Sequence, residues 1–144
     1  MSEADNPATP TPHGQPVEFR VPARLESLAL IRALVTALGT LEDLNLDAVA
    51  DLRLALDEAC TALIRSAAAD SRLTVTVQPR EHDVWVSVSA PTVDDNVLRP
   101  GTFSWHVISS LADDVETFRD GAKVGDPGGV FGITMTARRL DTAR

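Results

Sequence analysis

Apolar residues recur at helical spacing along two long segments of the chain. In residues 23–38 and again in residues 46–69 they return with the period of one face of an α-helix. The stripe of the first segment consists of Leu25, Leu28, Ile31, Leu34, Val35 and Leu38. The stripe of the second consists of Val49, Leu52, Leu56, Ala59, Leu63 and Ala67. This pattern predicts two amphipathic helices, with Gly39 ending the first and Asp47 near the start of the second.

Shorter segments with alternating polar and apolar side chains are predicted to be strands. Residues 17–21 alternate in this way and are followed by Pro22, which cannot continue a strand ladder. Residues 73–77 and 84–90 also alternate and flank the polar turn 79–83, so they are expected to form a hairpin. Further along are predicted a short helix at 103–112, a strand at 115–118, a glycine-rich turn at 121–129 and a strand at 130–138.

The order of these elements predicts an α+β fold. Strand, helix, helix, strand, strand, helix, strand, strand places the helices on one face of a mostly antiparallel sheet, in a two-layer sandwich. The chain has 144 residues, of which 44% are hydrophobic, enough for one domain with a real core. Residues 17–140 are expected to form this domain. Residues 1–16, rich in proline, are expected to be a disordered N-terminal tail, and residues 141–144 a C-terminal tail.

The charge balance narrows the range of partners. The formal net charge is -8 and the only lysine is Lys123, which argues against direct nucleic-acid binding because phosphate contacts need clustered basic residues. The same charge suits a basic protein partner. No apolar run reaches the roughly 18 residues that a membrane span needs, and no secretory signal opens the chain. With a lone Cys60, and with no second ligand near His82 or His106, we expect a cytoplasmic protein without a metal site built from side chains.

An acidic pair, Asp57 and Glu58, interrupts the apolar pattern of the second predicted helix. An unpartnered carboxylate in such surroundings is costly, so its presence needs a reason. The segment 58–62, Glu-Ala-Cys-Thr-Ala, resembles the N box E-A-x-T-N of the Bergerat fold, which GHKL and histidine-kinase-like ATPases share. It is most similar to anti-sigma-factor serine kinases of the RsbW and SpoIIAB type, including their anti-sigma-F branch. The resemblance covers residues 17–140.

This resemblance implies roles for individual residues of the N box. In the family, the glutamate is the general base that accepts a proton from a serine of an antagonist protein, so Glu58 is the candidate catalytic residue. The family's asparagine holds Mg²⁺, and Ala62 stands at its position. Because phosphoryl transfer depends on metal and positive groups to neutralise the transferring oxygens, this replacement removes a major contribution to a kinase reaction.

Two further nucleotide motifs of the family are also altered. In D-x-G-x-G, the aspartate that reads adenine falls on Ala90 and the glycines fall on Thr92 and Asp94, with Asp94 or Asp95 as a possible substitute acid. In the phosphate-binding G-x-G motif, Thr102 and Ser104 occupy the glycine positions. Gly101 lies one residue away, so 100–102 could still form a turn into a helix N-terminus, which is a weak anion site. The segment between these motifs is also short, which predicts a truncated ATP lid.

Two arginines and a tryptophan are the candidate contact residues. Arg32 occupies the position at which the family carries an arginine that contacts both sigma factor and antagonist, and Arg24 lies off the same apolar stripe. A guanidinium suits such a shared surface because its planar fork pairs two acceptors at once. Trp85 is out of phase with Val84 and Val86, so it is expected on the sheet face away from the helices, where a homodimer would form.

Two functions follow from the resemblance. The first is an anti-sigma factor that sequesters an alternative sigma factor and is released when anti-anti-sigma (STAS) antagonists compete for it. The second is an active serine/threonine protein kinase that also phosphorylates its antagonist with ATP and Mg²⁺. The altered nucleotide motifs favour the first, with ATP and Mg²⁺ binding weakened.

Overall fold

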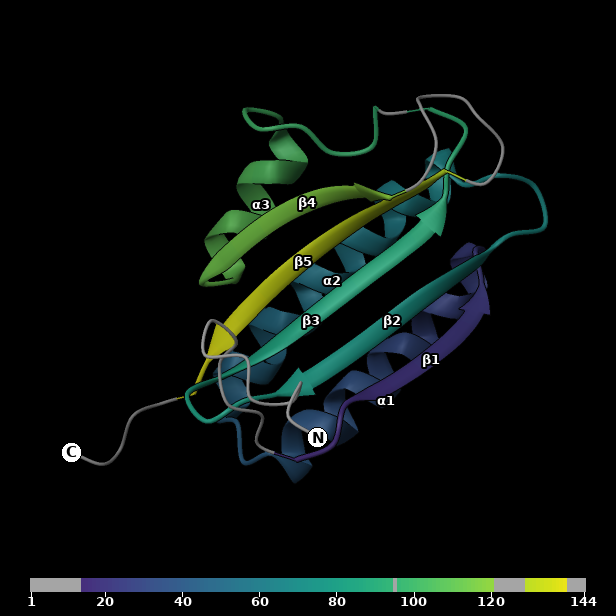
Figure 1. Cartoon of the computed structure of the whole chain (residues 1–144). Helices are drawn as coiled ribbons and strands as arrows, with labels where there is room; N and C mark the ends of the chain where they lie inside the picture. The colour runs from purple at the N-terminus through teal and green to yellow at the C-terminus, as the bar shows by residue number, and fades with distance from the viewer. Residues whose placement is uncertain (1–13, 95, 121–128, 140–144) are drawn as a thin grey trace, which may run out of the picture.

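The computed structural model describes residues 14–94, 96–120 and 129–139. They form a five-stranded sheet with the order β1-β2-β3-β5-β4, in which every neighbouring pair is antiparallel (Figure 1). The strands are β1 (Val17–Pro22), β2 (Arg72–Pro79), β3 (Asp83–Pro91), β4 (Asp114–Asp120) and β5 (Val130–Arg138). The helices are η2 (Leu25–Ser27, a 3₁₀ turn), α1 (Leu28–Leu41), α2 (Leu46–Ser66) and α3 (Phe103–Leu111). All helices cover one face of the sheet, which confirms the predicted α+β two-layer fold.

The predicted tails and the glycine-rich turn are largely beyond this description. Residues 1–13, 121–128 and 140–144 lie outside the described residues, as does Asp95. The placement of the domain boundary therefore stays a prediction. None of the helices in the described ranges is long and apolar enough to cross a membrane.

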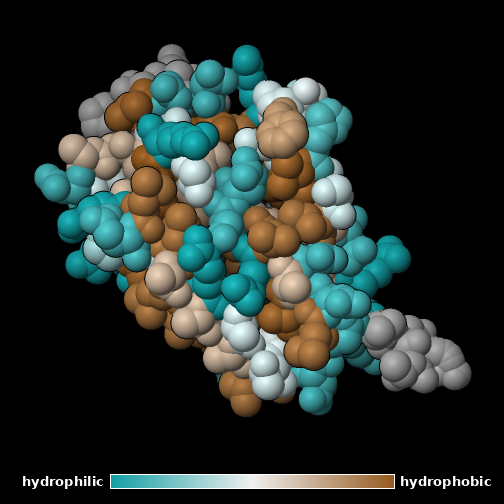
Figure 2. Space-filling view, turned by 180° about the vertical axis from the view of Figure 1, so that it is seen from behind, coloured by the Kyte–Doolittle hydropathy of each residue, from teal (hydrophilic) through white to brown (hydrophobic). Residues whose placement is uncertain are grey.

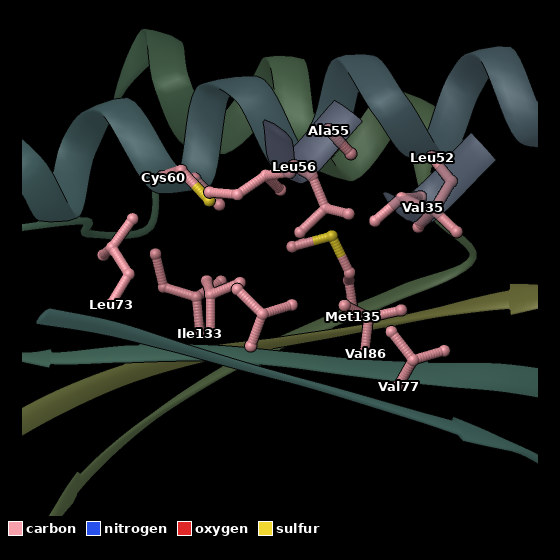
Figure 3. Packing of buried hydrophobic residues seen from close by; sticks show 14 of the residues in the cluster. Val35, Leu52, Ala55, Leu56, Cys60, Leu73, Val77, Val86, Ile133 and Met135 are labelled. Atoms are coloured by element: carbon pink, nitrogen blue, oxygen red, sulfur yellow. The ribbon is translucent and has the colours of Figure 1, made fainter. Parts of the chain in front are cut away.

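The core lies between α2 and the inner face of the sheet. Strands β2, β3 and β5 bury alternate residues, as the alternating pattern predicts. In Figure 3 the side chains of Leu56 and Cys60 point from α2 toward Val86, Ile133 and Met135 of the sheet, and all five are almost fully buried. At about 1.5–3 kcal/mol for each large aliphatic side chain removed from water, this layer is the main source of stability.

The first helix differs from the prediction at both ends. The chain is extended at Arg24, and a 3₁₀ turn precedes α1, which leaves Leu25 exposed. At the other end Gly39 does not terminate the helix, which continues to Leu41. A Cβ atom on Gly39 would lie 2.7 Å from Cγ2 of Val49, so glycine is needed here for the close approach of α1 and α2. The reversal of direction comes later, at Asp43, whose φ is 60°.

The second helix is shorter than the predicted 46–69. It begins after Asn45, whose side chain accepts a hydrogen bond from the Ala48 amide at 2.8 Å, and it ends at Ser66. The alanines that follow favour a helix by propensity, but Ala68 N–H donates to the carbonyl of Pro91 instead. The pairing of Ala67 with Thr92 reinforces this contact with the end of β3. Tertiary hydrogen bonds therefore override the local preference.

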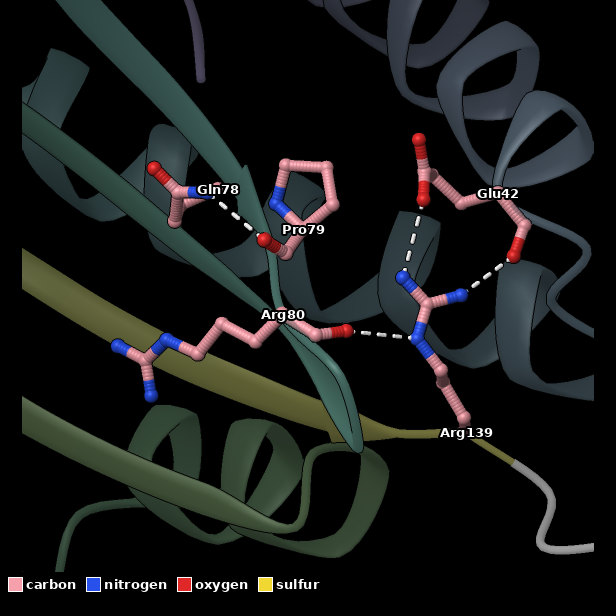
Figure 4. A network of polar contacts seen from close by, with 5 residues as sticks. All are labelled: Glu42, Gln78, Pro79, Arg80 and Arg139. Carbon is pink, nitrogen blue, oxygen red and sulfur yellow. Dashed lines mark hydrogen bonds and ion pairs between the residues drawn. The ribbon is translucent and has the colours of Figure 1, made fainter. Parts of the chain in front are cut away.

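An arginine at the end of β5 ties three segments together (Figure 4). The Nε of Arg139 donates to the Arg80 carbonyl at 2.9 Å, in the turn between β2 and β3. Its Nη1 donates to the carbonyl of Glu42 and its Nη2 to the Glu42 carboxylate at 3.0 Å, in the connection between α1 and α2. The Arg139 and Glu42 side chains are mostly buried. One guanidinium thus joins the sheet to the helical layer.

Replacement of this arginine is expected to destabilise the fold. Arg139→Ala leaves two backbone carbonyls and a carboxylate without their donor, which should lower the free energy of unfolding by about 2–3 kcal/mol. Arg139→Lys should recover only part of the loss, because an ammonium on a flexible stem cannot reproduce the fork. Urea unfolding followed by circular dichroism measures both variants. The matched control is Arg138→Ala, an exposed neighbour, for which about 0.5 kcal/mol or less is expected. Equal losses for the two alanine variants would contradict the role of Arg139.

Candidate functional site

The acidic pair of α2 finds its partners on two different helices. Glu58 lies on the side of α2 that packs against α3, and its Oε2 accepts a hydrogen bond of 2.6 Å from the Ser104 hydroxyl. Both side chains are half-buried. A short hydrogen bond to a charged acceptor is among the stronger ones that a protein makes. The carboxylate predicted as a general base is therefore held by the N-terminal turn of α3, and its catalytic role stays a prediction.

The positions of the family's metal and adenine ligands carry no polar side chain. Ala62 lies one helical turn after Glu58 and is buried, and Ala90 is buried near the end of β3. A methyl group can neither coordinate Mg²⁺ nor accept a hydrogen bond from an adenine amino group. The residues present at these two positions therefore do not fit ATP with Mg²⁺.

The candidate substitute acid Asp94 is used locally. Its Oδ1 accepts from the Asn96 amide at 3.0 Å, and its carbonyl accepts from the Thr92 hydroxyl at 2.9 Å. These are the contacts of a turn stabilised by an aspartate side chain. Its predicted role in nucleotide binding stays a prediction, and the alternative Asp95 lies outside the described residues.

The segment before α3 forms the turn that was expected. Gly101 has a φ of 90°, a conformation that favours glycine, and Thr102 is the N-cap of α3. The Thr102 hydroxyl oxygen accepts from the Trp105 amide at 3.2 Å and donates to the Arg99 carbonyl at 2.8 Å. A turn into a helix N-terminus is thus confirmed at 100–102. Because the threonine hydroxyl already caps this helix, anion binding by Gly101 and Thr102 stays a prediction.

The other acid of the pair, Asp57, holds Arg32. The Nε of Arg32, on α1, lies 2.8 Å and 2.9 Å from the two carboxylate oxygens of Asp57. The Arg32 side chain is 41% exposed and that of Asp57 29%, so Arg32 is less free than the sequence predicts for a residue on an exposed helix face. A half-exposed pair of this kind adds only about 0.2–1 kcal/mol to stability. Its main effect is on the direction in which the guanidinium points.

Two other predicted contact residues are placed as follows. Arg24 is exposed, in the extended segment before η2. Trp85 lies on the sheet face away from the helices, as its phase predicts, and is half-buried. The guanidinium carbon of Arg80 lies 5.7 Å from the centre of the tryptophan ring, so the neighbouring turn covers part of this ring.

Cys60 belongs to the core. Its thiol is fully buried on α2, and burial, together with the nearby charge of Asp57, raises its pKa to about 12. Because the thiolate is the reactive form, a thiol with this pKa is inert at neutral pH. Cys60 therefore acts as a small buried apolar side chain.

Two partners of the site were missed from the sequence. From the resemblance to the family, Ser104 is predicted only as a residue at a glycine position of the phosphate-binding motif. Asp57 is predicted only as one member of an acidic pair. The available signal was the cost of a half-buried carboxylate, which requires a donor within reach. That requirement does not identify the donor, because Arg32 and Ser104 are distant in sequence from the acids that they contact.

Comparison with known proteins agrees with this geometry. Residues 21–126 match the family model described as a histidine kinase-like ATPase domain. Over 145 aligned residues the chain is 54% identical to the proteins named anti-sigma-F factor RsbW from two strains of Mycobacterium tuberculosis. The match covers 100% of this chain and 86% of each relative. The chain therefore belongs to the family of histidine kinase-like ATPase domains and, within it, to the RsbW-type anti-sigma factors.

Proposed function

We propose that this anti-sigma factor binds an alternative sigma factor, keeps it from initiating transcription, and is released when STAS-domain antagonists compete for the same surface. The names of the two relatives support the class of function. The observation that carries the proposal is the geometry of Arg32 between α1 and α2. Its Nε is engaged by Asp57, whereas neither Nη atom has an acceptor among the residues that the structure describes.

A pre-positioned arginine is a good anchor for a partner. Because Asp57 fixes the side chain from one side, less side-chain entropy is lost when a partner carboxylate or carbonyl pairs with the two Nη groups. The surrounding surface is also suited to protein contact. Exposed leucines occur on both helices, Leu30 on α1 and Leu54 on α2, and Figure 2 shows hydrophobic side chains interspersed with polar ones over the helical layer. Apolar contacts beside a charge-assisted anchor are typical of protein interfaces.

The proposal is inhibition by binding, without phosphorylation of the antagonist. A serine kinase of this family needs a metal to neutralise charge on the transferring oxygens, and Ala62 offers no ligand for it. Glu58 is already paired with Ser104, so a substrate hydroxyl would have to displace an internal one. Exchange of partners would then depend on relative affinity and concentration, which makes competition the simplest account of release.

We also propose that the protein forms a homodimer through the outer face of the sheet. Trp85 pairs with Gln78 and Thr136 in register, and Phe118 lies across Gly132 two strands away on the same face. Both aromatic rings are partly exposed, and the strands on either side of Trp85 carry mainly threonine and glutamine side chains on this face. A face with aromatic anchors and few charges at its centre has the composition of an interface core.

Sigma-factor binding is tested with Arg32→Glu. Loss of the charge-assisted contact, plus repulsion, should weaken binding of both sigma factor and antagonist by about 1–3 kcal/mol, or roughly 5-fold to 150-fold in Kd. The melting temperature should hardly move, because the pair with Asp57 contributes little. Calorimetry with each purified partner measures the two affinities. Arg20→Glu makes the same charge change at an exposed position of β1, on the sheet face away from the helices, so it is the control and should bind normally. A variant that loses the antagonist yet keeps sigma factor would contradict competition for one surface.

Nucleotide binding separates the inhibitor from the kinase. ATP affinity should be weak and change less than about threefold when Mg²⁺ is chelated, because neither Ala62 nor Ala90 offers a ligand. Ala62→Asn alone should not produce phosphorylation of a STAS partner, since Ser104 still occupies Glu58. Calorimetry with and without EDTA, and transfer of labelled phosphate to the partner, measure the two outcomes. Micromolar ATP binding that is abolished by chelation, or label on a partner serine, would restore the kinase as the function.

Dimerisation is tested with Trp85→Asp. A carboxylate at the centre of an apolar contact should shift the protein from dimer to monomer, because an unpaired charge cannot be buried cheaply. Sedimentation velocity measures the change. Arg20→Asp, another substitution on this face but on edge strand β1, is the matched control and should remain dimeric. A monomeric unmodified protein, or an unchanged dimer in Trp85→Asp, would exclude this interface.

A further inference from the structure

A cleft lies between the end of β1 and the start of β2, on the opposite side of the fold from α3 (Figure 1). Its volume is about 380 Å³, and it is lined by Pro22, Ala23, Arg24, Asp70, Ser71 and Arg72. This size is within the range of sites for small organic molecules, about 300–1,000 Å³. Neither Glu58 nor Arg32 lines it, whereas Arg24, which the sequence predicts as a contact residue, does.

Backbone hydrogen bonds fix the walls of this cleft. Pro22 and Arg72 are opposite one another in the β1–β2 pair, and the Ala23 amide donates to the Ser71 carbonyl at 3.0 Å. The Ser71 amide donates to the Ala68 carbonyl at 3.2 Å. This hydrogen bond closes a turn in which Asp70 has a φ of 60°. The positions from which the two arginine side chains project are therefore set by the sheet and by this turn.

The arginine and serine side chains of the cleft have no partner among the residues that the structure describes. Within the described ranges, neither Arg24 nor Arg72 has an ion pair or a side-chain hydrogen bond. The Ser71 Oγ is buried and also has no hydrogen-bond partner among these residues. Buried hydroxyl groups without a partner are uncommon in folded proteins, and unpaired guanidinium groups are strong donors to an oxygen-rich anion.

We infer that the cleft between β1 and β2 binds a small organic acid through its carboxylate, with Arg24, Arg72 and the Ser71 hydroxyl as the contacting groups. The lining charges are two arginines and one aspartate, which leaves a surplus of one positive charge that matches a carboxylate. The carboxylate of Asp70, a lining residue, disfavours a phosphate dianion by like-charge repulsion. This binding site goes beyond the inhibition of a sigma factor, and its test requires no protein partner.

The test is a titration of the full-length ¹⁵N-labelled protein with sodium acetate, followed by amide NMR shifts at constant ionic strength and pH 7.5. Saturable shifts are expected at the amides of residues 23–24 and 70–72. Arg72→Gln removes the charge and can retain the backbone pairing of the strand. In this variant half-saturation should need at least about tenfold more acetate, the loss expected for one charge-assisted contact. Arg24→Gln should behave in the same way, and Ser71→Ala should show a smaller loss in the same direction.

Two controls make the result decisive. Arg53→Gln, an exposed arginine on α2, should leave the acetate titration unchanged. Inorganic phosphate, largely a dianion at this pH, should bind more weakly than acetate because of Asp70. Shifts that do not saturate, that persist unchanged in Arg72→Gln with a native spectrum, or that are saturated by phosphate at a lower concentration than by acetate would each overturn the inference.

Discussion

The burial of α2 against the inner face of the sheet determines the rest of the structure. Its apolar stripe faces the strands, while α1 and α3 pack along its two flanks. Polar residues on those flanks are half-buried and cannot rely on water alone for hydrogen bonds. Consecutive residues of a helix point about 100° apart, so Asp57 and Glu58 face different neighbours. Each acid therefore requires its own donor, Arg32 from α1 and Ser104 from α3.

This constraint explains how the scaffold of a histidine kinase-like ATPase domain accommodates alanine where the resembled family carries polar ligands. Alanine at positions 62 and 90 extends the buried apolar surface instead of projecting an amide or carboxylate. The hydroxyl of Ser104 then satisfies the carboxylate that remains at Glu58, and the hydroxyl of Thr102 caps α3 where the family has glycine. These contacts join α3 to α2 with ordinary internal hydrogen bonds. Without these two hydroxyl groups, the Glu58 carboxylate and the N-terminus of α3 would each lose a hydrogen bond.

The sequence predicts what depends on local periodicity and not what depends on long-range contact. The two-layer fold, the β2–β3 hairpin and the outward direction of Trp85 all follow from spacing, and the structure agrees with them. Gly39 was misassigned because its role depends on the approach of Val49, and the end of α2 was misplaced because Ala67 and Ala68 contact the end of β3. The role of Arg139 could not be predicted from periodicity, because its three acceptors belong to Arg80 and Glu42, which are far away along the chain. The sequence identifies Glu58, Asp57 and Arg32 as candidates, but not the pairing of Asp57 with Arg32 or of Glu58 with Ser104.

Under the proposed function, small differences in binding free energy at the partner surface decide which of the two competing proteins is bound. A partner contact at Arg32 worth 1.4 kcal/mol changes its Kd about tenfold, which is comparable to realistic differences in concentration between competing proteins. Asp57 contributes to this balance although it need not touch either partner, because it keeps the guanidinium in one orientation for both. A surface with one fixed anchor and adaptable leucines around it can accept two unrelated proteins in turn. Exchange between them then needs no chemical step, provided that neither partner binds so tightly that the other cannot replace it.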